Sequence, residues 1–212
     1  MTVERFPIWV LLILAIFIWG ATLYFYGTPL SWNHAAPYSI TLSVLTGTLV
    51  IYDRWAWSWA CFQFFHGIPD LRGTWRVQLE TTYRDPKTLE PRPPIHGFAA
   101  IRQTYSTLSI RLITKDSSSA LTASRFIIRQ DNTVEVAGVY QNDPIVHLRG
   151  RESEIHYGAF KVSVVGSPPH CIEGHYWTDR TTKGTIRYDQ RNDEIANSYD
   201  EAEKIFASAP SD

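Results

Sequence analysis

A hairpin-like stretch near the C-terminus carries the residue types that could recognise a small charged ligand. Residues 174–188 read GHYWTDRTTKGTIRY, an alternating strand, a polar turn and a second strand. Because successive side chains on a strand point to opposite faces, Tyr176 and Thr178 share one face, and Arg180 continues it at the strand end. Trp177 lies on the other face. An inward-facing first set would line a polar pocket, which an ordinary apolar core does not need.

Other predicted strands add rings and cations of the kinds that a nucleotide requires. An aromatic ring stacks on a base, an arginine forks onto a phosphate, and hydroxyls and amides bond base and ribose edges. A single strand tyrosine is more often a core residue, and a single alternating arginine more often faces solvent, so the prediction depends on their combination. The predicted ligand-binding residues are Trp75, Arg102, Tyr105, Arg125, Tyr140, Asn142, Tyr176, Thr178 and Arg180.

The sequence does not contain the motifs of common catalytic or metal sites. It has no HExxH, no GxSxG, no Walker loop and no GxGxxG after a strand. His147, His156 and His175 are interpreted as solvent-facing or turn-capping residues. We therefore predict no enzyme activity, no metal and no cofactor. The serine run at 117–119 is interpreted as a turn, or alternatively as a rim of hydroxyls that bond a ligand phosphate.

The elements that would position these residues are short strands with short connections. Such connections leave no room for the helical crossovers of a parallel sheet. The predicted fold class is an all-β domain at residues 67–192, an eight-stranded antiparallel up-and-down barrel that is either filled or holds one small ligand. An outer-membrane barrel is disfavoured, because it would show a lipid-facing apolar band on every strand. The predicted strands cover residues 71–83, 98–114, 120–130, 133–141, 145–151, 154–166, 171–179 and 184–191.

The N-terminal third has a different character and predicts two transmembrane α-helices within residues 1–66. Residues 7–27 hold no charged side chain, which suits a bilayer span and is too long for a signal peptide. After the loop SWNHAA, residues 37–52 form a second candidate span, and the tryptophan-rich residues 55–65 suit a membrane surface. A buried core helix is the alternative interpretation. Residues 193–212 are predicted to form a short helical or disordered tail.

Charge placement predicts the orientation and narrows the class of partner. Arg5 precedes the first candidate span, Arg54 and Arg72 follow the second, and the connecting loop has no Lys or Arg, so both termini are expected to be cytoplasmic. The net charge of −1 argues against a nucleic-acid polymer as partner, which would need a broad basic surface. Cys61 and Cys171 suggest neither a disulfide framework nor a thiolate metal site.

The order of these features resembles a known family. Two N-terminal helices, an aromatic segment, a GTW strand, a long strand running into KDSSS, the VYQNDP strand end and the GHYWTDRTTKGTI hairpin resemble the two-transmembrane β-barrel effectors of bacterial CBASS anti-phage systems. The resemblance implies a barrel that binds a cyclic dinucleotide made by a partner nucleotidyltransferase. It also implies an inner-membrane protein that forms homo-oligomers on activation, disrupts the lipid bilayer and kills the infected cell. On this resemblance, Tyr140, Asn142, Tyr176, Thr178 and Arg180 are the motif-bearing binding residues.

Two other functions stay open at this point. A membrane-anchored lipocalin-like carrier or sensor would bind a small ligand without killing, but should not place Tyr, Thr and Arg together inside the barrel. An anchored nucleotide hydrolase would use histidines and carboxylates that are present but show no catalytic arrangement.

Overall fold

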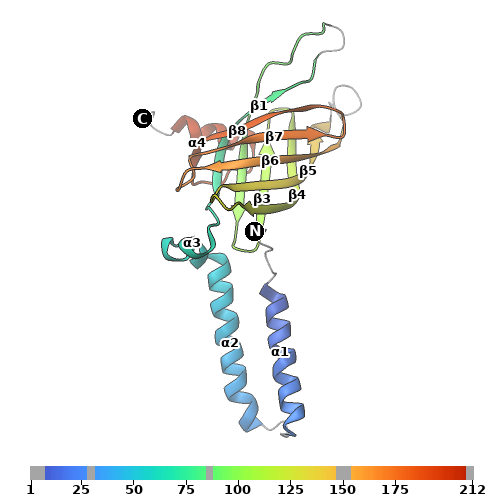
Figure 1. Cartoon of the computed structure of the whole chain (residues 1–212). Coiled ribbons are helices and arrows are strands. Elements are labelled where there is room, and N and C mark those ends of the chain that lie inside the picture. Colours follow the sequence, from blue (N-terminus) through green and yellow to red (C-terminus); the bar gives the residue numbers. More distant parts are fainter. Residues whose placement is uncertain (1–7, 28–31, 85–87, 147–153, 209–212) are drawn as a thin grey trace. The chain divides into compact units, whose positions relative to one another are not determined.

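The computed structural model describes residues 8–27, 32–84, 88–146 and 154–208. The chain divides into two compact units, one made of His66–Gln103 with Leu108–Asp212 and one made of Glu4–Phe65 with Thr104–Thr107. The first unit carries the strands and the second carries the N-terminal helices (Figure 1).

Within the described residues, eight antiparallel strands close a barrel in which each strand pairs with its neighbours in the chain and the last pairs with the first. The predicted barrel is therefore confirmed. The meander follows from the short connections, because consecutive antiparallel strands need only tight turns. The strands are β1 Gly73–Thr81, β2 Ile95–Gln103, β3 Leu108–Ile113, β4 Ser117–Ile128, β5 Val134–Pro144, β6 His156–Val165, β7 Cys171–Thr178 and β8 Lys183–Asn192.

The predicted strand boundaries are wrong in two places. The stretch 98–114 is not one bulged strand but the hairpin of β2 and β3. Its shift of apolar phase marks a turn, in which Thr104 N donates to Thr107 O at 3.0 Å and Thr107 N donates to Thr104 Oγ1 at 3.1 Å. The predicted strand 145–151 is also wrong for residues 145–146, which follow β5, while its residues 147–151 lie outside the described part.

The alternation predicted for the C-terminal hairpin is confirmed. Tyr176 is 8% exposed and faces the barrel interior, whereas Trp177 is 50% exposed on the outside. One end of the interior, near the β2–β3, β4–β5 and β6–β7 turns, is filled by apolar side chains such as Trp75, Ile101 and Val136. This filled end leaves the space for a ligand at the opposite end.

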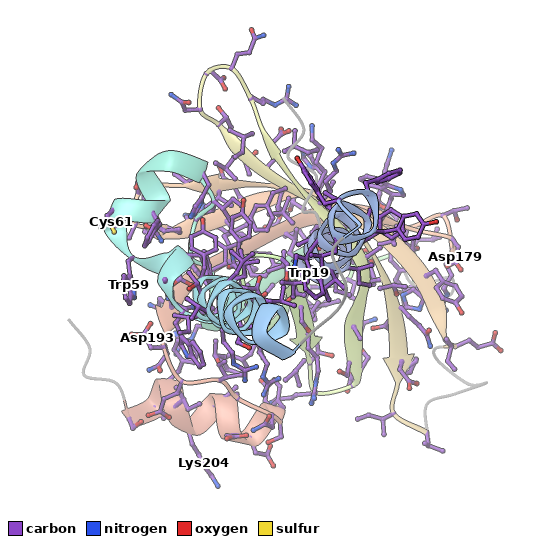
Figure 2. All side chains as sticks on the ribbon, turned by 90° about the horizontal axis from the view of Figure 1, so that it is seen from below. Trp19, Trp59, Cys61, Asp179, Asp193 and Lys204 are labelled. Carbon is purple, nitrogen blue, oxygen red and sulfur yellow. The ribbon has the colours of Figure 1, made fainter. Side chains whose placement is uncertain are left out.

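The tail contains a helix, α4 Tyr199–Ser208, which covers the outer face of the barrel at β2. The Phe206 ring stacks on Phe98 with centroids 5.5 Å apart, and the Tyr199 ring meets Phe98 edge-on at 5.3 Å. Lys204 points from the same helix away from the barrel (Figure 2). The described part of the tail is thus helical, and apolar packing against Phe98 holds it in place.

The second unit consists of α1 Ile8–Phe25, α2 Trp32–Arg54, the 3-10 turn Ala56–Ser58 and α3 Ala60–His66, the last residue of which already belongs to the strand unit. α1 ends in a turn at Gly27, whose φ of +59° suits glycine. α2 begins earlier than predicted and includes most of the SWNHAA loop, where two alanines favour helix. In the described part of the chain, no helix combines the length and apolarity of a membrane span.

Candidate ligand-binding site

The barrel contains a cavity of about 380 Å³ at the end opposite its filled core. All eight strands contribute to its wall, together with the β1–β2, β3–β4 and β7–β8 connections. Inward residues recur every second position along a strand, so seven strands line the cavity with two or three side chains each, while β2 contributes Ile95 alone. The site is therefore built by barrel closure, because no pair of neighbouring strands encloses it.

The cavity wall changes from apolar to polar along the barrel axis. On β1 the deeper lining residue is Leu79 and the outer one is Thr81; on β4 the deeper one is Leu121 and the outer one is Ser117. A ligand with flat, weakly polar parts and a charged part would match this gradient if its charge stays near the loops.

Three tyrosines, Tyr140, Tyr176 and Tyr188, lie around the deeper part of the cavity. The ring of Tyr140 stacks on Phe160 with centroids 6.4 Å apart. Burial raises the pKa of Tyr140 to about 12, and the neighbouring Tyr176 and Asp179 add to the shift. Burial likewise raises the pKa of Tyr188, with a contribution from Tyr140. Both phenols are therefore neutral near pH 7 and can donate or accept a hydrogen bond.

A glycine on β6 makes the position of Tyr140 possible. Gly158 pairs with Tyr140 across β5 and β6, and a Cβ built on Gly158 would overlap the Tyr140 ring and lie 2.8 Å from the backbone oxygen of Trp177. Any larger residue at this position would push the ring away from the wall or separate β6 from β7.

Two short hydrogen bonds organise the polar part of the wall. The Ser119 hydroxyl donates to Asn142 Oδ1 at 2.7 Å, between residues that pair across β4 and β5. The hydroxyls of Thr178 and Thr182 lie 2.7 Å apart across the β7–β8 turn. Both pairs line the cavity, so fixed hydroxyl and amide groups face a ligand there.

Cationic groups gather at the mouth of the cavity. Arg92 and Arg180 both line it, and Arg180 Nη1 lies 3.4 Å from Nδ1 of His156, which also faces the cavity. Arg92 Nη2 is 3.9 Å from a carboxylate oxygen of Asp116, a separation that leaves the guanidinium weakly engaged by this carboxylate. Guanidinium groups bond phosphate oxygens in a two-pronged geometry. The mouth is thus suited to an anionic group.

The structure brings five of the nine predicted binding residues together in this cavity. These five are Tyr140, Asn142, Tyr176, Thr178 and Arg180. Their contact with a ligand stays a prediction, while their shared location follows from the strand register.

The other four predicted residues do not line the cavity. Trp75 is fully buried at the filled end of the barrel, where its Nε1 donates to Leu71 O at 2.9 Å. Arg102 faces outward and donates to Asn197 Oδ1 at 3.0 Å. Trp75 faces inward but lies at the filled end of the barrel, and Arg102 lies on the outer face. Neither side chain therefore reaches the cavity wall.

Tyr105 and Arg125 also lie away from the cavity wall. Tyr105 sits in the β2–β3 turn rather than in mid-strand, and its ring meets Tyr52 edge-on at 5.1 Å. Arg125 is exposed on β4, one position from the buried Phe126, beyond a register shift between Leu121 and Ala123. The shift in β4 could not be read from the residue types.

Several lining residues were not predicted from the sequence. Tyr188 shares an inward face with Ile186 on β8, a signal that the alternation of GTIRYDQ does contain. His156 lines the cavity, and its Nδ1 also lies 3.0 Å from Glu154 O just before β6, which agrees with the turn-capping interpretation. Ser117 and Ser119 begin a strand instead of forming a turn, and both face the cavity. Arg92 arrives from a proline-rich loop that gives no local signal.

Comparison with known proteins identifies the family. The family model "Cap15, cyclic dinucleotide receptor domain" matches residues 66–190, which include the whole cavity wall. The chain belongs to this family of receptor domains, which is not a catalytic family. It is also similar to CD-NTase-associated protein 15 of Staphylococcus schleiferi, with 25% identity over 159 residues that cover 74% of this chain and 80% of the relative. The resemblance to CBASS effectors is confirmed.

Proposed function

We propose that the barrel cavity binds a cyclic dinucleotide and that binding activates the protein as an effector of anti-phage defence. Membership of a cyclic dinucleotide receptor family supports the ligand class. The observation that carries the proposal is the cavity itself, in which Tyr140, Asn142, Tyr176, Thr178 and Arg180 converge. Rings would stack on the bases, and Arg180 with Arg92 would bond the phosphates near the mouth.

A partner nucleotidyltransferase would supply the messenger. The name of the staphylococcal relative associates that protein with a CD-NTase, which agrees with this proposal. The polar mouth argues against a lipocalin-like carrier of apolar ligands, because an apolar guest would displace water from two arginines and a histidine and offer them no hydrogen bond in return.

The activated protein is proposed to form homo-oligomers in the inner membrane and to disrupt the bilayer. The uncharged stretch at 7–27 supports an anchored N-terminal region, and the arginine placement supports cytoplasmic termini. A periplasm-active reporter fused to the C-terminus should be inactive, and an active reporter would contradict the orientation. Membrane fractionation should recover the full chain in the pellet even after a high-salt wash.

The binding test uses the full chain in non-ionic detergent and calorimetry with cyclic di-AMP, cyclic di-GMP, cyclic GMP–AMP and cyclic UMP–AMP. At least one should bind with saturable, one-site heat, whereas AMP, GMP and a linear dinucleotide should bind much more weakly. Expression together with an active cyclic-dinucleotide synthase should arrest growth. If no cyclic dinucleotide binds, the proposed function is wrong.

A further inference from the structure

Ser119 and Asn142 form a buried polar pair in the cavity wall. Stacking by the aromatic rings and phosphate binding by the arginines do not explain the role of this pair. Each is less than a tenth exposed, at 8% and 7%, and they face each other across β4 and β5. The 2.7 Å bond runs from the Ser119 hydroxyl to the amide oxygen Oδ1 of Asn142. The serine hydrogen is thereby engaged within the wall, so it does not donate to a ligand phosphate.

This bond determines which end of the amide is left for the ligand. The oxygen end of an asparagine amide accepts hydrogen bonds and the nitrogen end donates two, although both ends have nearly the same shape. With Oδ1 held by Ser119, the Nδ2 group remains to donate. In the described part of the chain, the Asn142 amide has no side-chain partner besides Ser119.

This donor lies between the tyrosine-lined part of the cavity and its cationic mouth. Asn142 pairs with His156 on β6, and the next inward residue on β5 is Tyr140, whose neutral phenol and ring lie one step deeper. Arg180 lies beside His156 at the mouth. If a ligand has its phosphate at Arg180 and a base stacked near Tyr140, the edge of that base can reach the Asn142 amide.

We propose that Ser119 is a positioning residue that sets the base specificity of the cavity, by fixing Asn142 so that its amide nitrogen meets a ring nitrogen or carbonyl oxygen of a ligand base. The proposal rests on the proposed cyclic-dinucleotide function. Losing a hydrogen bond to a buried group carries a cost. In Ser119→Ala, the Asn142 amide can rotate and present its oxygen instead of its nitrogen to the base of another ligand. The variant should therefore lose more of its preference among the cyclic dinucleotides than of its affinity for them.

The test compares dissociation constants of the full chain for the same four cyclic dinucleotides, and its readout is the ratio between the tightest and the next ligand. Ser119→Ala should narrow this ratio roughly fivefold or more, and Ser119→Thr, which keeps the hydroxyl, should restore it. Ser118→Ala is the matched control, because Ser118 is the adjacent serine on the opposite face of β4, and its ratio should equal that of the wild type.

A second variant keeps the proposal testable if Ser119→Ala does not fold. Asn142→Asp has the same shape but replaces the donating nitrogen with an accepting oxygen, so the order of preference among the four ligands should change. An unchanged ratio in folded Ser119→Ala, or an unchanged order in Asn142→Asp, overturns the proposal. Failure of the wild type to bind any of the four overturns the proposed function instead.

Discussion

At the scale of single residues, the cavity combines neutral hydrogen-bonding groups in its depth with cations at its mouth. Burial keeps Tyr140 and Tyr188 protonated, and Arg180 lies beside His156 near the loops. A buried neutral phenol can satisfy a base edge without a charge to desolvate, while a partly exposed guanidinium can attract a phosphate at a smaller desolvation cost. The neutral groups thus lie where desolvation is greatest, and the charged groups lie where it is smaller.

The first prediction concerns the cationic mouth. Arg180→Gln should weaken binding of the tightest cyclic dinucleotide about tenfold or more, because a charge-assisted bond contributes about 1.5–3 kcal/mol. Calorimetry with the full chain measures the change. Arg187→Gln is the control, since Arg187 is an exposed arginine on the outer face of β8 and pairs with Glu173. Equal affinities for the two variants would show that Arg180 does not contact the ligand.

At the scale of elements, neighbouring strands position the binding side chains through close backbone approach. The β5–β6 pair holds Tyr140 over Gly158, and the β4–β5 pair holds Ser119 against Asn142. The outer face depends on α4, which covers Phe98 of β2. Residues from different strands therefore position the binding side chains together. Double variants can measure how strongly their effects on stability and binding depend on each other.

The second prediction is that Gly158→Ala both destabilises the barrel and weakens ligand binding about tenfold, because the added methyl displaces the Tyr140 ring. In the double variant Gly158→Ala/Tyr140→Leu, stability should recover in part while binding stays weak. Urea unfolding and calorimetry separate the two effects. Additive losses of stability in the double variant would contradict a direct clash between these residues.

The third prediction concerns the tail helix. Phe206→Ala removes the ring stacked on Phe98 and leaves that phenylalanine partly uncovered, so the free energy of unfolding should fall by about 1–3 kcal/mol. Lys204→Ala, on the exposed side of the same helix, should change it by less than about 0.5 kcal/mol. Thermal or urea unfolding of both variants checks this, and equal midpoints would mean that α4 does not support the barrel.

At the scale of the whole molecule, closure of the barrel creates the cavity and removes free strand edges from the sheet. It also places tyrosines from β5, β7 and β8 together in a buried environment. Because burial raises the pKa of Tyr140 and Tyr188, the ionisation of these two phenols is linked to folding of the barrel.

The fourth prediction is that stability falls at alkaline pH. An unfolded tyrosine ionises near pH 10, whereas the pKa of Tyr140 is raised to about 12 and that of Tyr188 is also raised. Above pH 10 the unfolded state releases protons that the native state retains, so the free energy of unfolding decreases by roughly 1 kcal/mol per pH unit for each such tyrosine. Well below pH 10 both states keep these protons, so the two tyrosines do not make the free energy of unfolding depend on pH.

Urea unfolding between pH 8 and 11 measures this loss, monitored by tryptophan fluorescence. Tyr188→Phe should flatten the alkaline decrease, whereas Tyr157→Phe, at an exposed position on the outside of β6, should not. The same slope in wild type and Tyr188→Phe would rule out a contribution from the buried phenol.

The barrel class of the strand domain, and the division of its clearest strands into two faces, follow from the sequence pattern alone. Alternation over GHYWTDR puts Tyr176 and Trp177 on opposite faces, because the two faces of a strand follow directly from backbone geometry. The closed barrel then makes the face of Tyr176 the inner one. Short polar connections likewise determine an antiparallel meander. These properties are local, and a single strand or turn contains all the information that they require.

Which inward residues share the cavity depends on how the strands pair in the closed barrel. Trp75 and Tyr176 both face inward, yet Trp75 fills one end of the barrel and Tyr176 lines the space at the other. Height along the barrel depends on the register between strands, and Arg92 joins the mouth through a loop whose path no local pattern specifies. The face on which a side chain lies is a property of a single strand. Its position along the barrel axis and the residues around it are set only when all eight strands have paired and closed the barrel.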